Sequence, residues 1–492
     1  MRILIILRRV PSEFKSQTSM GDMITAMIRA HKAAGFNIVL LPTRIEEKHN
    51  WETINAPTFF QNLKSRMIRI FSNRGYHYYR SSYVSKSVEK YHQTKEIDVL
   101  LAHCFSGDQA IYAAFIKDQI GIPFVIQEHR THYQRARYGI DDIPTIIRRA
   151  FLKADKVLAV SPQLADTMKS LGIRNDIEYL PNAITEEFFC KPKENGPFKK
   201  MVGNHFMFAG WTRWRYIKRL DLLIRAFSKV FEKRPDTRLV VAGSIETTEQ
   251  QKIINNLISE LEIEPYVSLY GFATRQQIHQ LAHSCDCCVI PSDDETFGLP
   301  ALEAIAAGKP VVATRCGGPE SIITSELLGR VVEKGDSNLL AQAMLSIIDN
   351  IESFNGEYIK EIAHKRYSES SIKNQWKNVY KDIIKNVNPP SKKRNRLVVS
   401  RNKRKKTPTK NKEERERIGF IKVIDRGKFQ KMGRLSKRLP ASMEKALIEV
   451  LNLFIRVFID MKIIKPNNFG IFSTLFQYNK YKKLILFYQK TP

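Results

Sequence analysis

Two glutamates with a glycine between them could bind a ligand that carries both hydroxyls and phosphate. Glu295 lies in the turn-forming segment SDDETFG, Glu303 lies in the apolar segment LPALEAIAA that follows, and Gly298 stands between them. A glycine at the end of a strand lets backbone N–H groups approach a ligand closely. The start of the next helix offers unpaired donors and a positive dipole end to a phosphate. A nucleotide sugar is a ligand of this kind.

The elements that would position these residues follow from residues 287–321. CCVIP is a short apolar run of the kind that forms a buried parallel strand. LPALEAIAA is predicted to be a helix, because Pro300 stands in its first turn and Gly308 just past its end. KPVVAT is the next predicted strand, and the GGP that follows ends it before another short helix. The glutamates would therefore lie at the carboxyl edge of a parallel sheet.

This block resembles retaining glycosyltransferase family 4, whose GT-B fold is α/β, with two Rossmann-like domains facing a cleft. The resemblance rests on the spacing Glu295-x7-Glu303, on FGLP inside it and on AAGKPVVAT and GGPE after it. The alternative is a plain βαβ unit with two solvated glutamates, and it does not account for the match of the whole block. The resemblance covers about residues 1–387.

The resemblance also implies roles for the residues of this block and for two glycines elsewhere. Glu295 would contact hydroxyls of the donor sugar, Glu303 would contact the ribose, and the amides of Gly298 and Leu299 would bind the diphosphate. Gly271 and Phe272 would hold the nucleobase, largely through backbone groups. The donor-binding residues implied in this way are Glu303, Phe297, Gly298, Leu299, Gly271, Phe272 and Gly21. Family members usually carry a pair of glycines where only Gly21 stands.

Two cations follow the predicted strand FMFAG and could neutralise a diphosphate leaving group. Arg213 and Lys218 lie where negative charge grows as a sugar–phosphate bond breaks, and their spacing resembles the pyrophosphate-binding pair of the family. The sequence departs from that pattern, because Arg219 replaces the usual glycine after the lysine, and Trp211, Trp214 and Arg215 add bulk. A basic solvated loop is the alternative interpretation.

His129 ends the predicted strand of GIPFVIQEH, at the edge where open α/β sheets bind ligands. The resemblance implies that it contacts the donor sugar, and a structural histidine is the alternative. Glu295, His129, Lys218 and Arg213 are therefore the predicted catalytic residues. No carboxylate stands out as a covalent nucleophile. Enzymes of this family are usually assigned a front-face displacement with retention of configuration. We expect no metal, and no cofactor beyond the nucleotide-sugar co-substrate.

The order of predicted elements divides the chain into five parts. Residues 1–190 are predicted to form a Rossmann-like domain, because strand, loop, helix and strand open it. The resemblance implies that this domain lies on the acceptor side. The resemblance implies that residues 200–366 form the nucleotide-sugar-binding domain, and that residues 367–387 form a helix that crosses back to the first domain. A basic disordered linker at 388–417 and a basic amphipathic extension at 418–492 complete the chain. The absence of G-x-G-x-x-G disfavours a dinucleotide oxidoreductase.

The net charge of +30 on 492 residues is concentrated at the end of the chain, since roughly two-thirds of it follows Asn388. A polybasic segment beside an amphipathic helix is typical of a peripheral membrane protein. Alternatively, the helix at the end of the chain packs on the two predicted domains, or the basic segment binds nucleic acid. Nucleic-acid binding is the least favoured of these hypotheses. Six unevenly spaced cysteines and a first apolar run too short for a secretion signal favour the cytosol.

These observations predict a metal-independent, retaining hexosyltransferase on the cytoplasmic face of a membrane. It would move a sugar from a nucleoside diphosphate to a glycan or lipid-linked acceptor in cell-surface polysaccharide or glycolipid synthesis. The rival hypothesis is a degenerate GT-B scaffold whose basic tail binds nucleic acid or a protein. Cys285, Cys287 and Cys288 could suggest a metal site, but alternate residues of a strand point to opposite faces. Buried strand cysteines are the favoured interpretation.

Overall fold

The computed structural model describes residues 1–8, 19–43, 52–54, 73–137, 139, 142–194 and 196–387. The predictions for residues 388–417 and 418–492 lie outside the described residues. The described part contains two parallel sheets of six strands each. In spatial order, the first sheet comprises β2 (Asn37–Pro42), β1 (Arg2–Leu7), β3 (Val99–Cys104), β4 (Phe124–Glu128), β5 (Lys156–Ala159) and β6 (Ile177–Tyr179). The second sheet comprises β12 (Gly329–Val332), β11 (Val311–Thr314), β10 (Cys287–Ile290), β7 (Phe206–Trp211), β8 (Thr237–Ala242) and β9 (Val267–Gly271).

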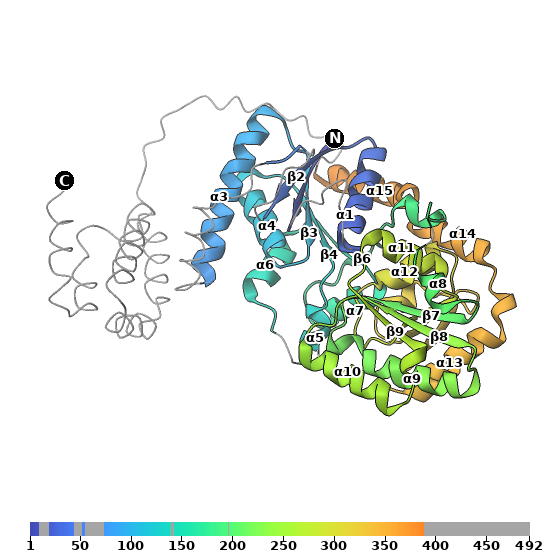
Figure 1. Cartoon of the computed structure of the whole chain (residues 1–492). Coiled ribbons are helices and arrows are strands. Elements are labelled where there is room, and N and C mark those ends of the chain that lie inside the picture. The colour runs from blue at the N-terminus through green and yellow to red at the C-terminus, as the bar shows by residue number, and fades with distance from the viewer. Residues whose placement is uncertain are drawn as a thin grey trace, which may run out of the picture. The chain divides into compact units, whose positions relative to one another are not determined.

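Helices lie on both faces of each sheet (Figure 1), so most strand residues are buried and the strands read as continuous apolar runs. The helices that accompany the first sheet are α1 (Ser19–Ala33), α3 (Asn73–Thr94), α4 (Asp108–Ile120), α5 (His132–Arg137), α6 (Thr145–Lys153) and α7 (Pro162–Ser170). Those that follow are α8 (Phe198–Val202), α9 (Leu220–Lys233), α10 (Thr248–Glu260), α11 (Arg275–Ser284), α12 (Leu299–Ala306), α13 (Ser337–Asp349), α14 (Gly356–Tyr367) and α15 (Glu369–Val387). Short 3₁₀ turns include η1 (Glu186–Phe189), η2 (Tyr216–Lys218) and η4 (Pro319–Ser321).

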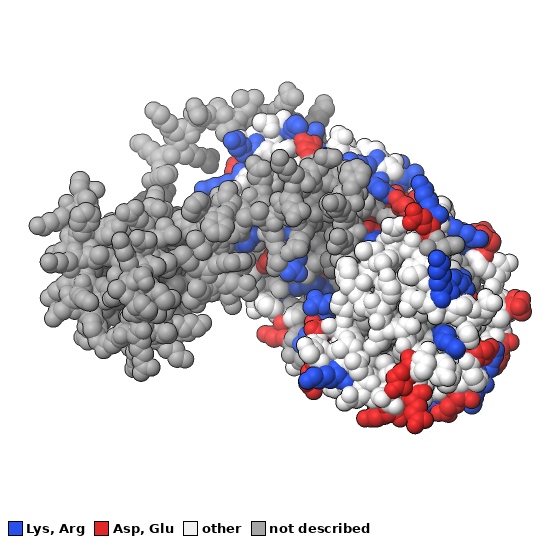
Figure 2. Space-filling model, viewed as in Figure 1, with Lys and Arg blue, Asp and Glu red and all other residues white. Residues whose placement is uncertain are grey.

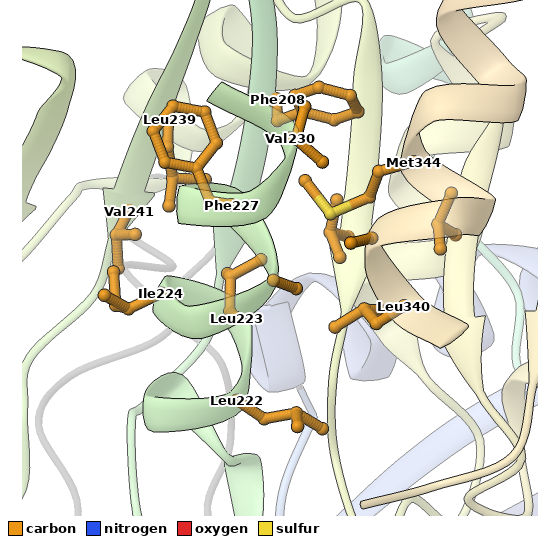
Figure 3. Close-up of a cluster of buried hydrophobic side chains, with 14 of the residues drawn as sticks. Phe208, Leu222, Leu223, Ile224, Phe227, Val230, Leu239, Val241, Leu340 and Met344 are labelled. Atoms are coloured by element: carbon orange, nitrogen blue, oxygen red, sulfur yellow. The ribbon is translucent and has the colours of Figure 1, made fainter. Parts of the chain in front are cut away.

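One core lies between the second sheet and the helices α9 and α13. Phe227 and Val230 of α9 are fully buried, and Leu340 and Met344 of α13 pack in the same cluster (Figure 3). Leu222, Leu223, Phe227 and Val230 recur at helical spacing, which gives α9 one apolar face for this cluster. This packing fixes the start of α9 against the carboxyl edge of the sheet, where the predicted cations lie.

The last described helix, α15, packs into the core of the first sheet. Its buried residues Trp376 and Tyr380 belong to the same cluster as Ile3 and Ile5 of β1, and Figure 1 shows α15 beside α1. Helix α1 begins at Ser19, so Gly21 lies in its first turn. Helix α8 begins at Phe198, just before residue 200, the predicted start of the second domain.

His31 joins α1 to α15 and predicts an acid-labile fold. Its Nδ1 lies 2.7 Å from the Met27 carbonyl oxygen, and its Nε2 lies 2.9 Å from the Tyr380 hydroxyl. Burial lowers the pKa of His31 to about 4, from 6.5. The unfolded chain takes up this proton near pH 6.5 and the folded chain does not, so stability is full above pH 6.5 and declines towards pH 4.

We expect about 3 kcal/mol of stability to depend on His31 remaining neutral, which is the free energy that corresponds to this pKa shift. The measurement is the thermal unfolding midpoint of the full chain between pH 7.5 and pH 4.5. His31→Gln keeps a polar side chain that does not titrate, and it should make the acid decline shallower. His103 and His283, whose pKa values burial also lowers, should leave part of the decline in place. An identical pH profile for His31→Gln would contradict this assignment.

The described surface carries charges of both signs. Figure 2 shows Lys and Arg interspersed with Asp and Glu over the face that it presents. No described helix is both long enough and apolar enough to cross a bilayer. Cys285, Cys287 and Cys288 are all buried, and no three described His, Cys, Asp or Glu side chains lie together in a way that could hold a metal ion.

Candidate active site

A cavity of about 980 Å³ lies where residues that follow the strands of both sheets meet. The first sheet contributes Phe105, which follows β3, and His129, which follows β4. The second sheet contributes Arg213 after β7, Phe272 after β9 and Glu295 after β10. Ligands of open α/β sheets bind at the carboxyl ends of the strands, and the cavity has this position in both sheets.

His129 lines this cavity and has a buried ring nitrogen. The residue is 8% exposed, and its Nε2 has no hydrogen-bond partner in the described structure. The ring lies against Phe105, with centroids 4.6 Å apart, and against His103, with centroids 4.1 Å apart. Burial, followed by the influence of His103, lowers the pKa of His129 well below 6.5. A neutral imidazole with an unpaired nitrogen is suited to hydrogen-bond a hydroxyl.

A network centred on Glu128 holds the backbone that carries His129. The Glu128 side chain is fully buried and accepts hydrogen bonds from Nε of Arg130 at 2.9 Å and from the backbone N–H of His129 at 3.0 Å. The Tyr133 hydroxyl donates to the same carboxylate at 3.2 Å. Arg130 also lines the cavity, so this network fixes one wall of the site.

Glu295 and Lys218 form an ion pair at the wall of the cavity. Lys218 Nζ lies 2.6 Å from Glu295 Oε1, and the two side chains are 7% and 12% exposed. The Ser292 hydroxyl donates to the same carboxylate oxygen at 3.3 Å, and the backbone N–H of Glu295 donates to the Cys316 carbonyl at 2.8 Å. Glu295 lines the cavity, and Lys218 lies behind it. Lys218 can therefore contact a ligand directly only if its ion pair with Glu295 breaks. While the pair is intact, Lys218 affects the ligand only by holding Glu295 in place.

The amino end of α12 also lines the cavity, through Phe297, Gly298, Leu299 and Pro300. Gly298 precedes the helix with φ 90°, a left-handed conformation that favours glycine. A Cβ added there would lie 2.9 Å from Pro319. Gly298 therefore lets the chain turn sharply into the helix at the wall of the cavity, which Gly298 and Leu299 both line.

Glu303 lies behind the cavity wall in a buried charge network. It is 1% exposed, it accepts from the indole N–H of Trp211 at 2.6 Å, and Arg275 Nη1 donates to it at 2.6 Å. Arg275 also pairs with Asp22 of α1, and its guanidinium carbon lies 4.0 Å from the centroid of the Phe188 ring. The network therefore connects a helix of the first sheet to a helix of the second.

The structure brings most of the predicted site residues into one cavity. His129, Arg213, Glu295, Phe272, Phe297, Gly298 and Leu299 line it. Lys218 adjoins it through Glu295, and Glu303 adjoins it through Trp211 and Arg275, which both line it. Gly271 ends β9 next to Phe272, and Gly21 lies next to Asp22. Arg213, with a side chain 72% exposed, lies 3.4 Å from Glu246.

Sequence reasoning missed several residues that shape the site. Arg275 and Asp22 lie far apart in the chain, and neither belongs to a motif that would mark it. Glu128 and Arg130 adjoin His129, so a charged pair flanking a candidate histidine is a signal that could have found them. Phe105 follows β3 directly, and the carboxyl end of that strand pointed to its position.

Two successive segments of the chain match glycosyltransferase family models. Residues 20–188 match Glycosyltransferase Family 4, and residues 199–365 match Glycosyl transferases group 1. An uncharacterised glycosyltransferase of Methanocaldococcus jannaschii is 30% identical over 300 residues, which span 57% of this chain and 74% of that protein. The chain belongs to glycosyltransferase family 4. The family predicted from the Glu295–Glu303 block is thereby confirmed.

One further relative and two solved structures are similar to this glycosyltransferase. The N-acetyl-alpha-D-glucosaminyl L-malate synthase of Bacillus anthracis is 27% identical over 302 residues, or 60% of this chain and 77% of the relative. Anabaena HepE, solved with UDP and glucose, superposes with a TM-score of 0.58 at 19% identity, over 78% of this chain and all of that one. Sucrose-phosphate synthase of Thermosynechococcus elongatus superposes with a TM-score of 0.62 at 17% identity, over 78% of this chain and 99% of that one. The predicted GT-B fold is confirmed.

Proposed function

We propose that this glycosyltransferase moves a hexose from a nucleoside diphosphate to an acceptor with retention of configuration. The observation that carries the proposal is the cavity in which His129, Glu295, Arg213 and the amino end of α12 meet. These groups can bind sugar hydroxyls and a diphosphate at one place. Relatives that are glycosyltransferases support a sugar-transfer reaction. A nucleotide-sugar donor is supported by HepE, which was solved in complex with UDP-glucose.

Each residue has a role in this proposal. His129 and Glu295 hydrogen-bond the donor sugar, while Lys218, Arg213 and the α12 amides stabilise the departing diphosphate. Glu303 binds the ribose. Because its carboxylate is 1% exposed and bonded to Trp211 and Arg275, ribose binding requires that these side chains move and open the carboxylate to the cavity. Displacement occurs on the face from which the diphosphate leaves, and the leaving phosphate helps to take the acceptor proton.

The acceptor in this proposal is a glycan or a lipid-linked sugar, and the process is cell-surface polysaccharide or glycolipid synthesis at the cytoplasmic face of a membrane. The test is a donor-consumption assay with the full chain and UDP-, GDP- and ADP-sugars, with and without candidate acceptors. We expect slow hydrolysis of one donor and faster turnover with the right acceptor. The product anomer, read by NMR, should keep the donor configuration. If no donor is consumed or bound, the result would favour the alternative hypothesis of a catalytically degenerate GT-B scaffold.

Donor turnover should continue in the presence of a chelator. The proposed site neutralises the diphosphate with Arg213, Lys218 and backbone amides, so a divalent ion is not needed for that step. The measurement is the initial rate with and without EDTA. Loss of all activity in EDTA, followed by recovery with Mg²⁺ or Mn²⁺, would show that this account of the leaving group is wrong.

The basic tail, residues 388–492, is proposed to bind the full chain to anionic membranes. Each Lys or Arg near an anionic surface contributes about 1 kcal/mol, and this attraction decays over about 8 Å at physiological salt. The full chain should sediment with anionic vesicles, and high salt should release it only in part because apolar residues of the tail add a salt-insensitive contribution. A chain ending at Val387 should stay in solution. Equal sedimentation of both chains would contradict the proposal.

A further inference from the structure

The cations predicted to bind the diphosphate are already close to carboxylates. Lys218 lies 2.6 Å from Glu295, and its side chain is 7% exposed. Arg213 lies 3.4 Å from Glu246. These pairs offset much of the positive charge that the sequence places at the site. Because a nucleoside diphosphate carries more than one negative charge, a further cation that faces the cavity would strengthen its binding.

Arg215 is such a cation. It lines the same cavity as Arg213, and it is exposed. Within the described part of the chain its guanidinium forms no hydrogen bond or ion pair, in contrast to the side chains of Arg213, Lys218 and Arg275. Its guanidinium is therefore available to pair with an anion, and a guanidinium can donate two parallel hydrogen bonds to a phosphate.

The side chain of Trp214 fixes the position of Arg215 relative to Arg213. Trp214 is 1% exposed, and its indole N–H donates to the Ala242 carbonyl at 2.9 Å. Its backbone N–H donates to Ser244 at 3.0 Å, and its carbonyl accepts from the Glu246 N–H at 2.9 Å. Successive side chains of an extended segment point to opposite sides. With Trp214 turned into the core, Arg213 and Arg215 both point to the cavity.

The core leaves room for this ring at Gly210. A Cβ added to Gly210 would lie 3.2 Å from Cη2 of Trp214, closer than ordinary van der Waals contact. The Trp214 side chain, which is part of the departure of this loop from the family pattern, is therefore packed in the core of the second sheet and does not line the cavity. The loop can carry two arginines to the site because the tryptophan between them is anchored.

We propose that Arg215 is a second phosphate-binding residue of the donor site, and that Trp214 is the positioning residue that holds it beside Arg213. This inference rests on the proposed function and assigns a ligand group to one part of that site. Held in this position, Arg215 adds a positive charge that no described carboxylate offsets, and this charge is available to the diphosphate. It also explains why two arginines flank a tryptophan where the family pattern has a single arginine.

The test compares binding of nucleoside diphosphates with binding of the corresponding nucleosides. UDP, GDP and ADP, and uridine, guanosine and adenosine, are titrated by calorimetry into the full wild-type chain and its variants. Arg215→Gln should weaken the best-bound diphosphate about tenfold, the size expected for a lost hydrogen bond between charged groups. It should leave nucleoside binding unchanged. Arg215→Lys should recover part of the loss, and Trp214→Phe, which removes the anchoring indole N–H, should show the same selective loss.

Arg225→Gln is the matched control, because Arg225 is an exposed arginine of α9 that lies outside this cavity. It should bind every ligand as the wild type does. The inference is overturned if Arg215→Gln retains full diphosphate affinity, if it loses diphosphate and nucleoside affinity alike, or if it raises only the KM of the acceptor. If the wild type binds none of the diphosphates, the proposed function itself fails, and this inference fails with it.

Discussion

Replacing Lys218 by alanine is expected to lower donor turnover about a hundredfold, the effect seen when one preorganised charge-stabilising donor is removed. The substitution removes a cation next to the proposed leaving group. It also leaves Glu295, 12% exposed and otherwise bonded to Ser292, without its ion-pair partner. Steady-state rates at saturating donor should show the loss in kcat, because the charge acts mainly in the transition state.

The control for this prediction separates the two effects of the substitution. Lys218→Ala combined with Glu295→Gln removes the carboxylate charge together with the cation. If Lys218 mainly keeps Glu295 in place, the double variant should resemble Glu295→Gln alone. A further loss in the double variant would support a direct role in stabilising the diphosphate. A rate for Lys218→Ala within threefold of the wild type would exclude both roles.

Replacing Arg275 by methionine is expected to destabilise the chain by about 3–5 kcal/mol, the cost of removing one partner from a buried ion pair. The side chain of Arg275 is 11% exposed, and the two carboxylates that it pairs with, Asp22 and Glu303, are 17% and 1% exposed. Methionine fills the space but leaves both carboxylates without their cation. Because the network joins α1 to α12, we also expect weaker donor binding.

Arg315→Met is the matched control for this prediction. Arg315 pairs with Glu333 at 2.7 Å, almost the length of the pair between Arg275 and Glu303, but its side chain is 55% exposed. An exposed pair contributes about 0–1 kcal/mol, so its loss should barely change the unfolding midpoint. Adding Glu303→Gln to Arg275→Met should recover part of the stability. Equal, small effects of both arginine substitutions would show that the buried network does not stabilise the fold.

Local sequence patterns were sufficient to predict the strands, the family and the site edge. The predicted strand CCVIP appears as β10 and the predicted helix LPALEAIAA appears as α12, which Gly298 precedes in a left-handed conformation. Such features depend on neighbouring residues, through apolar periodicity, glycine conformation and helix capping. For the same reason, His129, Arg213 and Glu295 could be assigned to carboxyl ends of strands, which a parallel sheet brings to one edge.

Only the tertiary structure decided which partners the charged residues have. It pairs Lys218 with Glu295, encloses Glu303 between Trp211 and Arg275, and turns Trp214 into the core so that Arg215 faces the cavity. These contacts join residues that are distant in sequence, and the energy of each depends on burial and on the position of the partner. A single sequence fixes neither quantity. Residue types and spacing therefore determined the edge at which the chemistry lies, and packing determined which cations remain available there.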